Sequence, residues 1–255
     1  MNQVIVVIGL GEMGSVFARA LLRLGHPVYP VSRDTDITTF CKDLPQPKMV
    51  LVAVGETDLQ PILEQIPQQW QSSLVLLQNE LLPRDWQAHA LQDPTIISVW
   101  FEKKKGQDVK VLIPSPVFGP HAGLISNALA TLDIPVKELV SEKELELELV
   151  IKNVYILTTN IAGLVIGGTV DDLWSQNETL ARDIANDVID IQQKLTGTTY
   201  DREQLISGMV KAIDGDRAHN NMGRSAPARL KRAIQQADEF NLEVTKLREI
   251  AAAQT

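Results

Sequence analysis

The stretch VIVVIGLGEMG (residues 4–14) is followed by a helical pattern of apolar residues that ends at Gly25. An apolar run, a glycine loop and a helix in this order are typical of the start of a dinucleotide-binding domain. Gly9 permits a tight turn after the strand, and Gly11 lets a pyrophosphate approach the backbone. Gly14 lets the helix pack closely against the strand. A second apolar strand at residues 28–31 follows at the expected distance.

The backbone of this loop can bind an anion although its side chains carry no positive charge. Free N–H groups and the positive end of the helix dipole meet at the start of the helix and would face the phosphates. We therefore expect six loop residues to bind the cofactor: Gly9, Leu10, Gly11, Glu12, Met13 and Gly14. The alternative is a glycine loop that binds nothing, because cofactor-free relatives of such domains exist.

The residues after the second strand indicate which dinucleotide is bound. An acidic side chain there selects the free 2′-hydroxyl of NAD, whereas an arginine accommodates the 2′-phosphate of NADP. Ser32 and Arg33 occupy this position, and the planar guanidinium of Arg33 is suited to a phosphate. The sequence therefore predicts NADP. A strand that ended two residues later would place Asp34 on the ribose and would favour NAD.

The composition is that of a globular protein, with 255 residues of which 44% are apolar and 22% charged. This length suits two ordinary domains. The net charge of −8 argues against nucleic acid as a partner. The N-terminal apolar run is too short for a membrane span and lacks the features of an export signal, so we expect a cytoplasmic protein. The single cysteine, Cys41, excludes a disulfide framework and a thiolate metal site, and we expect no metal.

Alternating strands and helices in the first 80 residues predict an α/β fold with a doubly wound parallel sheet. The runs at residues 49–54 and 73–78 are apolar enough for strands that are covered on both faces. Gly55 and Asn79 directly follow these strands. Because ligands of such sheets bind at the carboxyl ends of the strands, we expect both residues to join the glycine loop in the cofactor site.

The pattern after residue 94 predicts an antiparallel extension of this Rossmann sheet. A hairpin is indicated by strands at residues 96–101 and 109–113, with prolines 114, 116 and 120 ending it. A helix at 123–132 and a last strand at 135–139 should follow. Basic residues gather at 103–105 and at 224–232, and we interpret them as a solvated hairpin tip and a solvated helix face.

From Ser141 onward the sequence shows no convincing strand, and helical patterns continue to the end. Ser141 and Glu144 form a capping-box pattern before a long apolar helix, whose far end contains three glycines. Further helices are expected at residues 178–195, 202–214 and 226–240, with a short one at the end. We therefore predict an NADP-binding Rossmann domain at residues 1–140 and a helical substrate or dimerisation domain at residues 141–255.

A reductase of this architecture needs a group that protonates the substrate oxygen as the hydride arrives. Lys152 is the best candidate because it is a lone cation in the apolar stretch 145–166, where burial would lower its pKa. Asn160 lies a little over two helical turns further on and can share its face. The alternative is an exposed lysine, or one whose apolar stem packs on the helix while its ammonium reaches water.

The GLGEMG loop, the all-helical second half and the Lys-x7-Asn pair resemble the ketopantoate reductase family, within the 6-phosphogluconate dehydrogenase-like superfamily. The resemblance covers nearly the whole chain. It implies an NADPH-binding domain with a Gln-Asn pair after the fourth strand, which Gln78 and Asn79 match. It also implies that Lys152 and Asn79 act in catalysis, with Asn160 as the second of two asparagines, and that Arg33 contacts the 2′-phosphate. Ile156 replaces the first asparagine.

Three other positions depart from the pattern of the family. Gly55 replaces a lysine that follows the third strand. Aligned through Met209 and Arg217, the chain has Gly208 for a serine and Asn220 for a glutamate that binds the substrate hydroxyl. Asn220 can still hydrogen-bond to a substrate but carries no charge. The cofactor site is therefore preserved, whereas the ketopantoate pocket is not.

These observations favour an NADP-dependent oxidoreductase of ketopantoate reductase-like type, which transfers a hydride to a carbonyl or imine of a small molecule other than ketopantoate. The resemblance also allows a homodimer. The main alternative is a catalytically inactive NADP-binding sensor or scaffold. A 3-hydroxy acid dehydrogenase would need asparagines three and four residues after the lysine, where Tyr155 and Ile156 stand.

Overall fold

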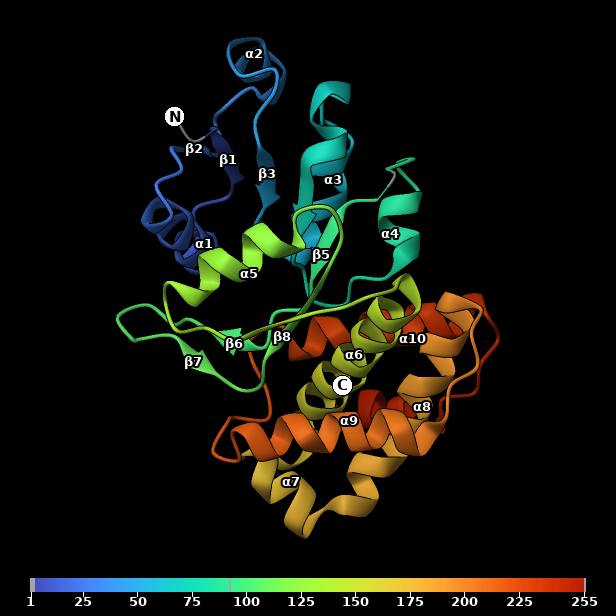
Figure 1. Cartoon of the computed structure of the whole chain (residues 1–255). Coiled ribbons are helices and arrows are strands. Elements are labelled where there is room, and N and C mark those ends of the chain that lie inside the picture. The colour runs from blue at the N-terminus through green and yellow to red at the C-terminus, as the bar shows by residue number, and fades with distance from the viewer. Residues whose placement is uncertain (1–2, 92, 255) are drawn as a thin grey trace. The chain divides into compact units, whose positions relative to one another are not determined.

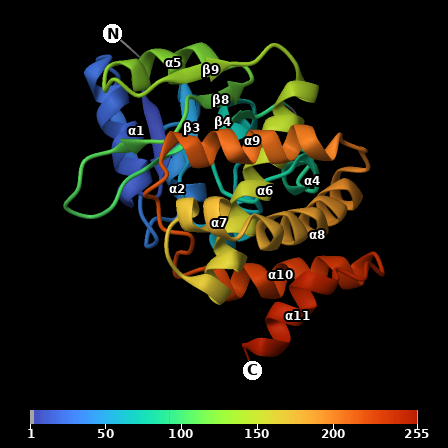
Figure 2. The ribbon, with the colours of Figure 1, turned by 90° about the horizontal axis from the view of Figure 1, so that it is seen from below.

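The computed structural model describes residues 3–91 and 93–254. The chain forms two compact units, of which the first ends at Glu148 and the second begins at Leu149. The first unit contains the sheet, and the second is helical (Figures 1 and 2). The division falls inside one long helix, α6 (Glu142–Ile166).

The main sheet has seven strands in the order β2-β1-β3-β4-β5-β8-β9. The first five are parallel, β8 is antiparallel to β5, and β9 is parallel to β8. The predicted Rossmann sheet with an antiparallel extension is thereby confirmed. The strand bounds are β1 Ile5–Ile8, β2 Val28–Val31, β3 Met49–Val52, β4 Leu74–Leu76, β5 Thr95–Ile97, β8 Ser115–Phe118 and β9 Val136–Glu138.

The central strands are apolar at consecutive positions because helices cover both faces of the sheet. All four residues of β1 and of β3 are buried, and Ile5 pairs with Met49. On one face α1 (Glu12–Arg23) and α5 (Ala122–Ala130) lie side by side, as Figure 1 shows. Phe17 and Leu129 from these helices are fully buried, and burial of each such side chain contributes about 1.5–3 kcal/mol.

Several short helices of the first unit were not predicted. The helix α2 (Ile37–Asp43) begins at Asp36, whose carboxylate accepts hydrogen bonds from the backbone of Thr38 and Thr39. Its Phe40 packs edge-on against Trp70. Also not predicted were η1 Glu56–Asp58, η2 Gln68–Ser73 and α4 Pro83–Gln87. The helix α3 (Leu59–Leu63), by contrast, is one of the helices expected to alternate with strands in the first 80 residues.

The expected hairpin is correct in part. A two-stranded sheet is formed by β6 (Phe101–Glu102) and β7 (Lys110–Val111), but the residues before it belong to β5 of the main sheet. The expectation that Pro116 ends the extended region was wrong, because Pro116 lies inside β8. It is tolerated because it stands opposite Ser98, one residue beyond the end of β5, and its carbonyl still accepts the Ser98 N–H at 2.9 Å.

The second unit consists of most of α6 and five further helices, and α10 and α11 pack together in it (Figure 2). The helix α6 begins as predicted at Ser141, whose hydroxyl accepts the Glu144 N–H at 3.2 Å. The Glu144 carboxylate accepts from the backbone of Val140. The helix α7 was not predicted. The five helices are α7 Val170–Gln176, α8 Glu178–Thr196, α9 Arg202–Gly215, α10 Ala226–Glu239 and α11 Thr245–Ala253.

The glycines near the end of α6 have two different roles. The helix continues through Gly163, where a Cβ would lie 2.6 Å from the Met222 side chain, so this glycine permits close packing within the unit. The helix ends at Gly167 and Gly168, which have positive φ angles of 61° and 66°. Within the described residues, α6 is the one helix long and apolar enough for a membrane span, but 72% of its apolar window is buried, as in a core helix.

Candidate functional site

The three glycines of the loop can be told apart by what a side chain would meet. Gly9 has a φ of +91°, and a Cβ there would lie 2.8 Å from the carbonyl oxygen of Ala53, at the end of β3. A Cβ at Gly14 would lie 2.0 Å from the Gly9 carbonyl oxygen. A Cβ at Gly11 would meet no protein atom within 4 Å. Packing therefore explains Gly9 and Gly14, whereas packing does not require glycine at position 11, where the backbone is open on the Cβ side.

The loop leads directly into α1, which has no side-chain cap at Gly11. The first hydrogen bond of the helix runs from the Ser15 N–H to the Gly11 carbonyl at 2.9 Å. The N–H groups of Glu12, Met13 and Gly14 therefore have no partner in the helix ladder, and the positive end of the helix dipole lies beside them. This arrangement fits the pyrophosphate of a dinucleotide.

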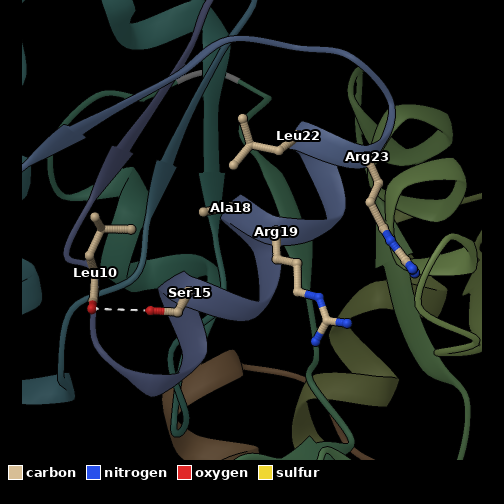
Figure 3. Close-up of a pocket in the computed structure, with 6 residues that line it drawn as sticks. All are labelled: Leu10, Ser15, Ala18, Arg19, Leu22 and Arg23. Atoms are coloured by element: carbon tan, nitrogen blue, oxygen red, sulfur yellow. Dashed lines mark hydrogen bonds between the residues drawn. The ribbon is translucent and has the colours of Figure 1, made fainter.

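A hollow of about 490 Å³ lies along α1 beside the loop (Figure 3). Across its end nearest the loop, the Ser15 hydroxyl donates to the Leu10 carbonyl at 3.3 Å. Leu10 is the one predicted cofactor residue that lines the hollow, so the hollow borders the predicted site and does not coincide with it. The lining residues are Leu10, Ser15, Ala18, Arg19, Leu22 and Arg23.

Ser32 and Arg33 lie in a turn directly after β2. The Ser32 N–H donates to the Thr35 hydroxyl at 3.2 Å, which fixes the turn. The side chain of Arg33 is 93% exposed and lies 3.7 Å from the Asp58 carboxylate, so the ion pair is weak. Asp34 is also exposed. The guanidinium of Arg33 is thus accessible to an anion at the end of β2.

The carboxyl ends of β3 and β4 are joined by Gln78. Its side chain is 7% exposed and donates to the carbonyl oxygens of Val52 and Val54, at 2.7 and 3.3 Å. Asn79 follows and donates to the Glu56 carboxylate at 3.2 Å. Because β1, β3 and β4 are neighbours, the glycine loop, Gly55 and Asn79 all follow adjacent strands at one edge of the sheet. Glu56, which stands in the turn after β3, was not predicted to lie beside Asn79.

Lys152 is half-buried on α6. Burial, and then the positive charge of Arg229, lower the pKa of Lys152 from 10.5 to about 7. A lysine with this pKa is present in both the charged and the neutral form near neutral pH. It can therefore act as a proton donor or acceptor under these conditions.

Asn160 is 8% exposed and uses most of its hydrogen-bonding capacity inside the second unit. Its oxygen accepts from Arg229 Nη1 at 2.9 Å and from the Gly223 N–H at 3.2 Å. Its amide nitrogen donates to the Ile156 carbonyl at 2.9 Å, so one N–H remains for another contact. Asn160 and Lys152 are thus both coupled to Arg229, the first by a hydrogen bond and the second by its charge.

Arg229 corrects one interpretation from the sequence. The basic stretch at residues 224–232 was interpreted as a solvated helix face, but Arg229 is only 8% exposed. Its place in the stretch gives no sign of this, because the neighbouring Arg232 and Lys231 are also basic. The usable signal is its spacing, since Arg229 stands three residues after the buried Ala226 and four before the buried Ala233.

The last two positions of interest lie on α9 and on the segment after it. A Cβ at Gly208 would lie 2.7 Å from Ile151 Cγ2, so a larger residue would displace the Ile151 side chain where α9 meets α6. Asn220 is exposed and pairs through a β-bridge with Thr169. Arg217 nearby forms ion pairs of 2.6 Å with Asp171 and with Asp214. Among the residues that the structure describes, no cluster of acidic, histidine or cysteine side chains could hold a metal ion.

A Rossmann sheet with a phosphate-type glycine loop, followed by a separate helical unit, defines a dinucleotide-binding fold of two parts. Solved structures with this fold include a probable 2-dehydropantoate 2-reductase from Bacillus subtilis, with a TM-score of 0.69, 15% identity and 98% of each chain covered. A 2-dehydropantoate 2-reductase from Methylococcus capsulatus has a TM-score of 0.67 and 14% identity over 100% of this chain and 96% of the other. A D-mandelate dehydrogenase solved with NADH and anilino(oxo)acetate has a TM-score of 0.67 and 12% identity, over 97% and 96%.

The chain therefore has the fold of the ketopantoate reductases, as its sequence indicated. No protein-family model matches the sequence, and no curated protein matches it either. At identities of 12–15% the structural likeness establishes the fold alone.

Proposed function

We propose that this protein is an NADP-dependent oxidoreductase of ketopantoate reductase-like type, which transfers a hydride to a carbonyl or imine of a small molecule other than ketopantoate. The observation that carries the proposal is the place of Lys152, which is half-buried on the apolar helix α6, where burial and the charge of Arg229 lower its pKa to about 7. A lysine whose pKa lies near the working pH is suited to act as a general acid. It occurs in a chain whose first unit has a glycine loop suited to a dinucleotide.

The cofactor site would use the backbone of the glycine loop for the pyrophosphate and Arg33 for the 2′-phosphate. Support comes from Gly11, which has no packing reason to be glycine, and from the 93% exposure of the Arg33 side chain. The D-mandelate dehydrogenase with this fold was solved with NADH, which supports a nicotinamide cofactor, either NAD(H) or NADP(H). The bound cofactor would supply the hydride, and the chain would supply binding, orientation and a proton.

Lys152 would donate its proton to the substrate oxygen or nitrogen in the direction of reduction. Its pKa of about 7 means that the charged form is lost as the pH rises through 7. The rate of reduction should therefore fall above this pH, whereas the reverse oxidation should fall below it. Asn79 would hold the substrate by a hydrogen bond, and the remaining N–H of Asn160 would provide a second one. Asn220 would contribute a further polar contact.

Two positions argue against ketopantoate as the substrate. Gly208 cannot become serine without displacing Ile151, and Asn220 has no charge with which to bind a substrate hydroxyl strongly. Each lost contact with a charged partner corresponds to about 1.5–3 kcal/mol of binding energy. The pocket should therefore favour a substrate with fewer polar groups.

The rival proposal is an NADP-binding sensor or scaffold without activity. Two measurements distinguish the oxidoreductase from the inactive protein. The first is NADPH binding by calorimetry, and the second is NADPH oxidation with a panel of 2-oxo acids, ketones and cyclic imines. We expect binding, turnover of at least one panel member and little or no turnover of ketopantoate. Binding without any turnover would favour the rival, and robust turnover of ketopantoate would show that the substrate assignment is wrong.

The proposed oligomeric state rests on the structural likeness, and the proposed location rests on the cysteine content. A ketopantoate reductase from Staphylococcus aureus with this fold is described as dimeric, which supports a homodimer here. Light scattering on the purified protein tests this, and a monomer at micromolar concentration would contradict it. A cytoplasmic location is supported by the single cysteine, Cys41, which is buried and free.

A further inference from the structure

The glycine loop contains an acidic residue where an anion is expected to bind. Glu12 is the first residue of α1, and its side chain is 46% exposed. A carboxylate in the first turn stabilises the helix through the dipole. The same carboxylate repels a pyrophosphate that approaches the N–H groups beside it, because like charges at short range disfavour binding. An acidic phosphate loop therefore needs a positive charge close to Glu12.

Lys103 supplies a positive charge at this point. Its ammonium lies 3.4 Å from the Glu12 carboxylate, and its side chain is 23% exposed. The ammonium also donates to the Lys104 carbonyl oxygen at 2.8 Å, which restricts its position. Lys103 comes from the β6–β7 hairpin, far from the glycine loop in the sequence, and both residues belong to the first unit.

The base of the hairpin is attached to the helix that follows the glycine loop. Phe101, in β6, is 5% exposed, and its ring centroid lies 6.0 Å from that of Phe17 in α1. Val111, in β7, packs against the same core. Lys103 follows Phe101 by two residues, so this buried contact places it near the start of α1. The base of the hairpin is therefore packed against the core of the first unit, and only its far end is a solvated tip.

The two neighbouring lysines differ from Lys103. Lys104 is 52% exposed and pairs with Glu102 of its own hairpin at 3.1 Å. Lys105 is exposed. Among the described contacts, the link between this basic run and α1 is made by Lys103. Lys105 is a matched control, because replacing it removes the same charge from the same hairpin.

We propose that Lys103 supports cofactor binding through Glu12: its ammonium neutralises the Glu12 carboxylate and so allows this loop to bind the pyrophosphate of a dinucleotide. The inference rests on the proposed function, since it assumes that a dinucleotide binds at the loop. Lys103 would therefore affect the binding of the pyrophosphate, which NADPH and NADH both contain. Arg33, by contrast, would contact the 2′-phosphate that distinguishes them.

The test is a double-mutant cycle measured by calorimetry with NADPH and with NADH at low ionic strength. Lys103→Met should weaken both cofactors by a similar factor of about three to ten, because the pair is partly exposed and its effect is limited by screening. Lys105→Met should change affinity by less than about twofold, since exposed charges contribute little. In a Glu12→Gln background, Lys103→Met should have little effect. Lys103→Arg should keep most of the affinity.

Each other outcome overturns the proposal. Equal losses in Lys103→Met and Lys105→Met would show a general effect of hairpin charge. An undiminished loss in the Glu12→Gln background would show that Lys103 does not act through Glu12. If the wild-type protein binds neither dinucleotide, the proposed function fails as well. If it binds one and Lys103→Met behaves like the control, only the present inference fails.

Discussion

Replacement of Lys152 by methionine should make the protein more stable while removing the proposed acid. Burial and Arg229 lower the pKa of Lys152 from 10.5 to about 7, so the native state opposes its charged form. A shift of this size corresponds to about 4–5 kcal/mol at and below pH 7, at about 1.4 kcal/mol per pKa unit. Methionine has a similar length and no charge, so it should recover much of this energy.

The effect of pH has a definite sign. The unfolded chain binds more protons than the native protein between pH 7 and 10.5, so wild-type stability should rise with pH across this range. The advantage of Lys152→Met should be greatest below pH 7, about 2 kcal/mol at pH 9, and close to zero above pH 10.5.

The assay is urea unfolding of both proteins between pH 6 and about 9.5, followed by circular dichroism. Lys211→Met is the control, because Lys211 is an exposed lysine of α9 in the same unit, and its replacement should change stability by less than about 0.5 kcal/mol. A Lys152→Met protein that is no more stable than wild type at pH 6 would refute the reasoning. So would a gain in stability that does not depend on pH.

Three further predictions concern the loop, the cofactor and the helical unit. Gly14→Ala should fold poorly, because its Cβ would lie 2.0 Å from a backbone oxygen, whereas Gly11→Ala should melt like wild type and bind NADPH at least about tenfold more weakly; equal melting temperatures for the two variants would contradict this. NADPH should bind at least about tenfold more tightly than NADH, a difference of about 1.4 kcal/mol that Arg33→Leu should abolish, and calorimetry showing equal affinities in the wild type would refute it. Asn160→Ala should lose about 2–4 kcal/mol in urea unfolding, because a buried arginine and a backbone N–H lose their acceptor; a loss below 1 kcal/mol would count against these bonds.

Much of the sheet could be predicted from the sequence because its signals are local. The apolar runs at β1 and β3 are uninterrupted, and the glycine loop has a fixed spacing. The strand β8 was missed because a proline usually ends a strand, and Pro116 is tolerated only because it stands opposite Ser98, one residue beyond the end of β5. The helices α2 and α7 were missed because short helices depend on their caps more than on periodicity, as Asp36 and Thr169 show.

The site was predictable to a smaller extent, since it depends on contacts between distant residues. The positions of Gly11 and Asn79 follow from strand order, and the low pKa of Lys152 agrees with its apolar surroundings in the sequence. Arg229 was missed because it stands in a basic run, and the signal that separates it from its neighbours is its helical spacing from the buried Ala226 and Ala233. Lys103 was likewise interpreted as solvated, since its approach to the glycine loop is fixed by a contact between two phenylalanines.

The most direct test of the proposed function compares Lys152→Ala with Lys211→Ala in NADPH binding and in turnover of the best substrate from the panel. Both variants should bind NADPH within about twofold of wild type, because the glycine loop and Arg33 would make those contacts. Lys152→Ala should lower turnover by roughly a hundredfold to ten-thousandfold, as expected when a general acid is lost, and Lys211→Ala should leave it unchanged. Turnover by Lys152→Ala at the wild-type rate would contradict the assignment of Lys152 as the acid.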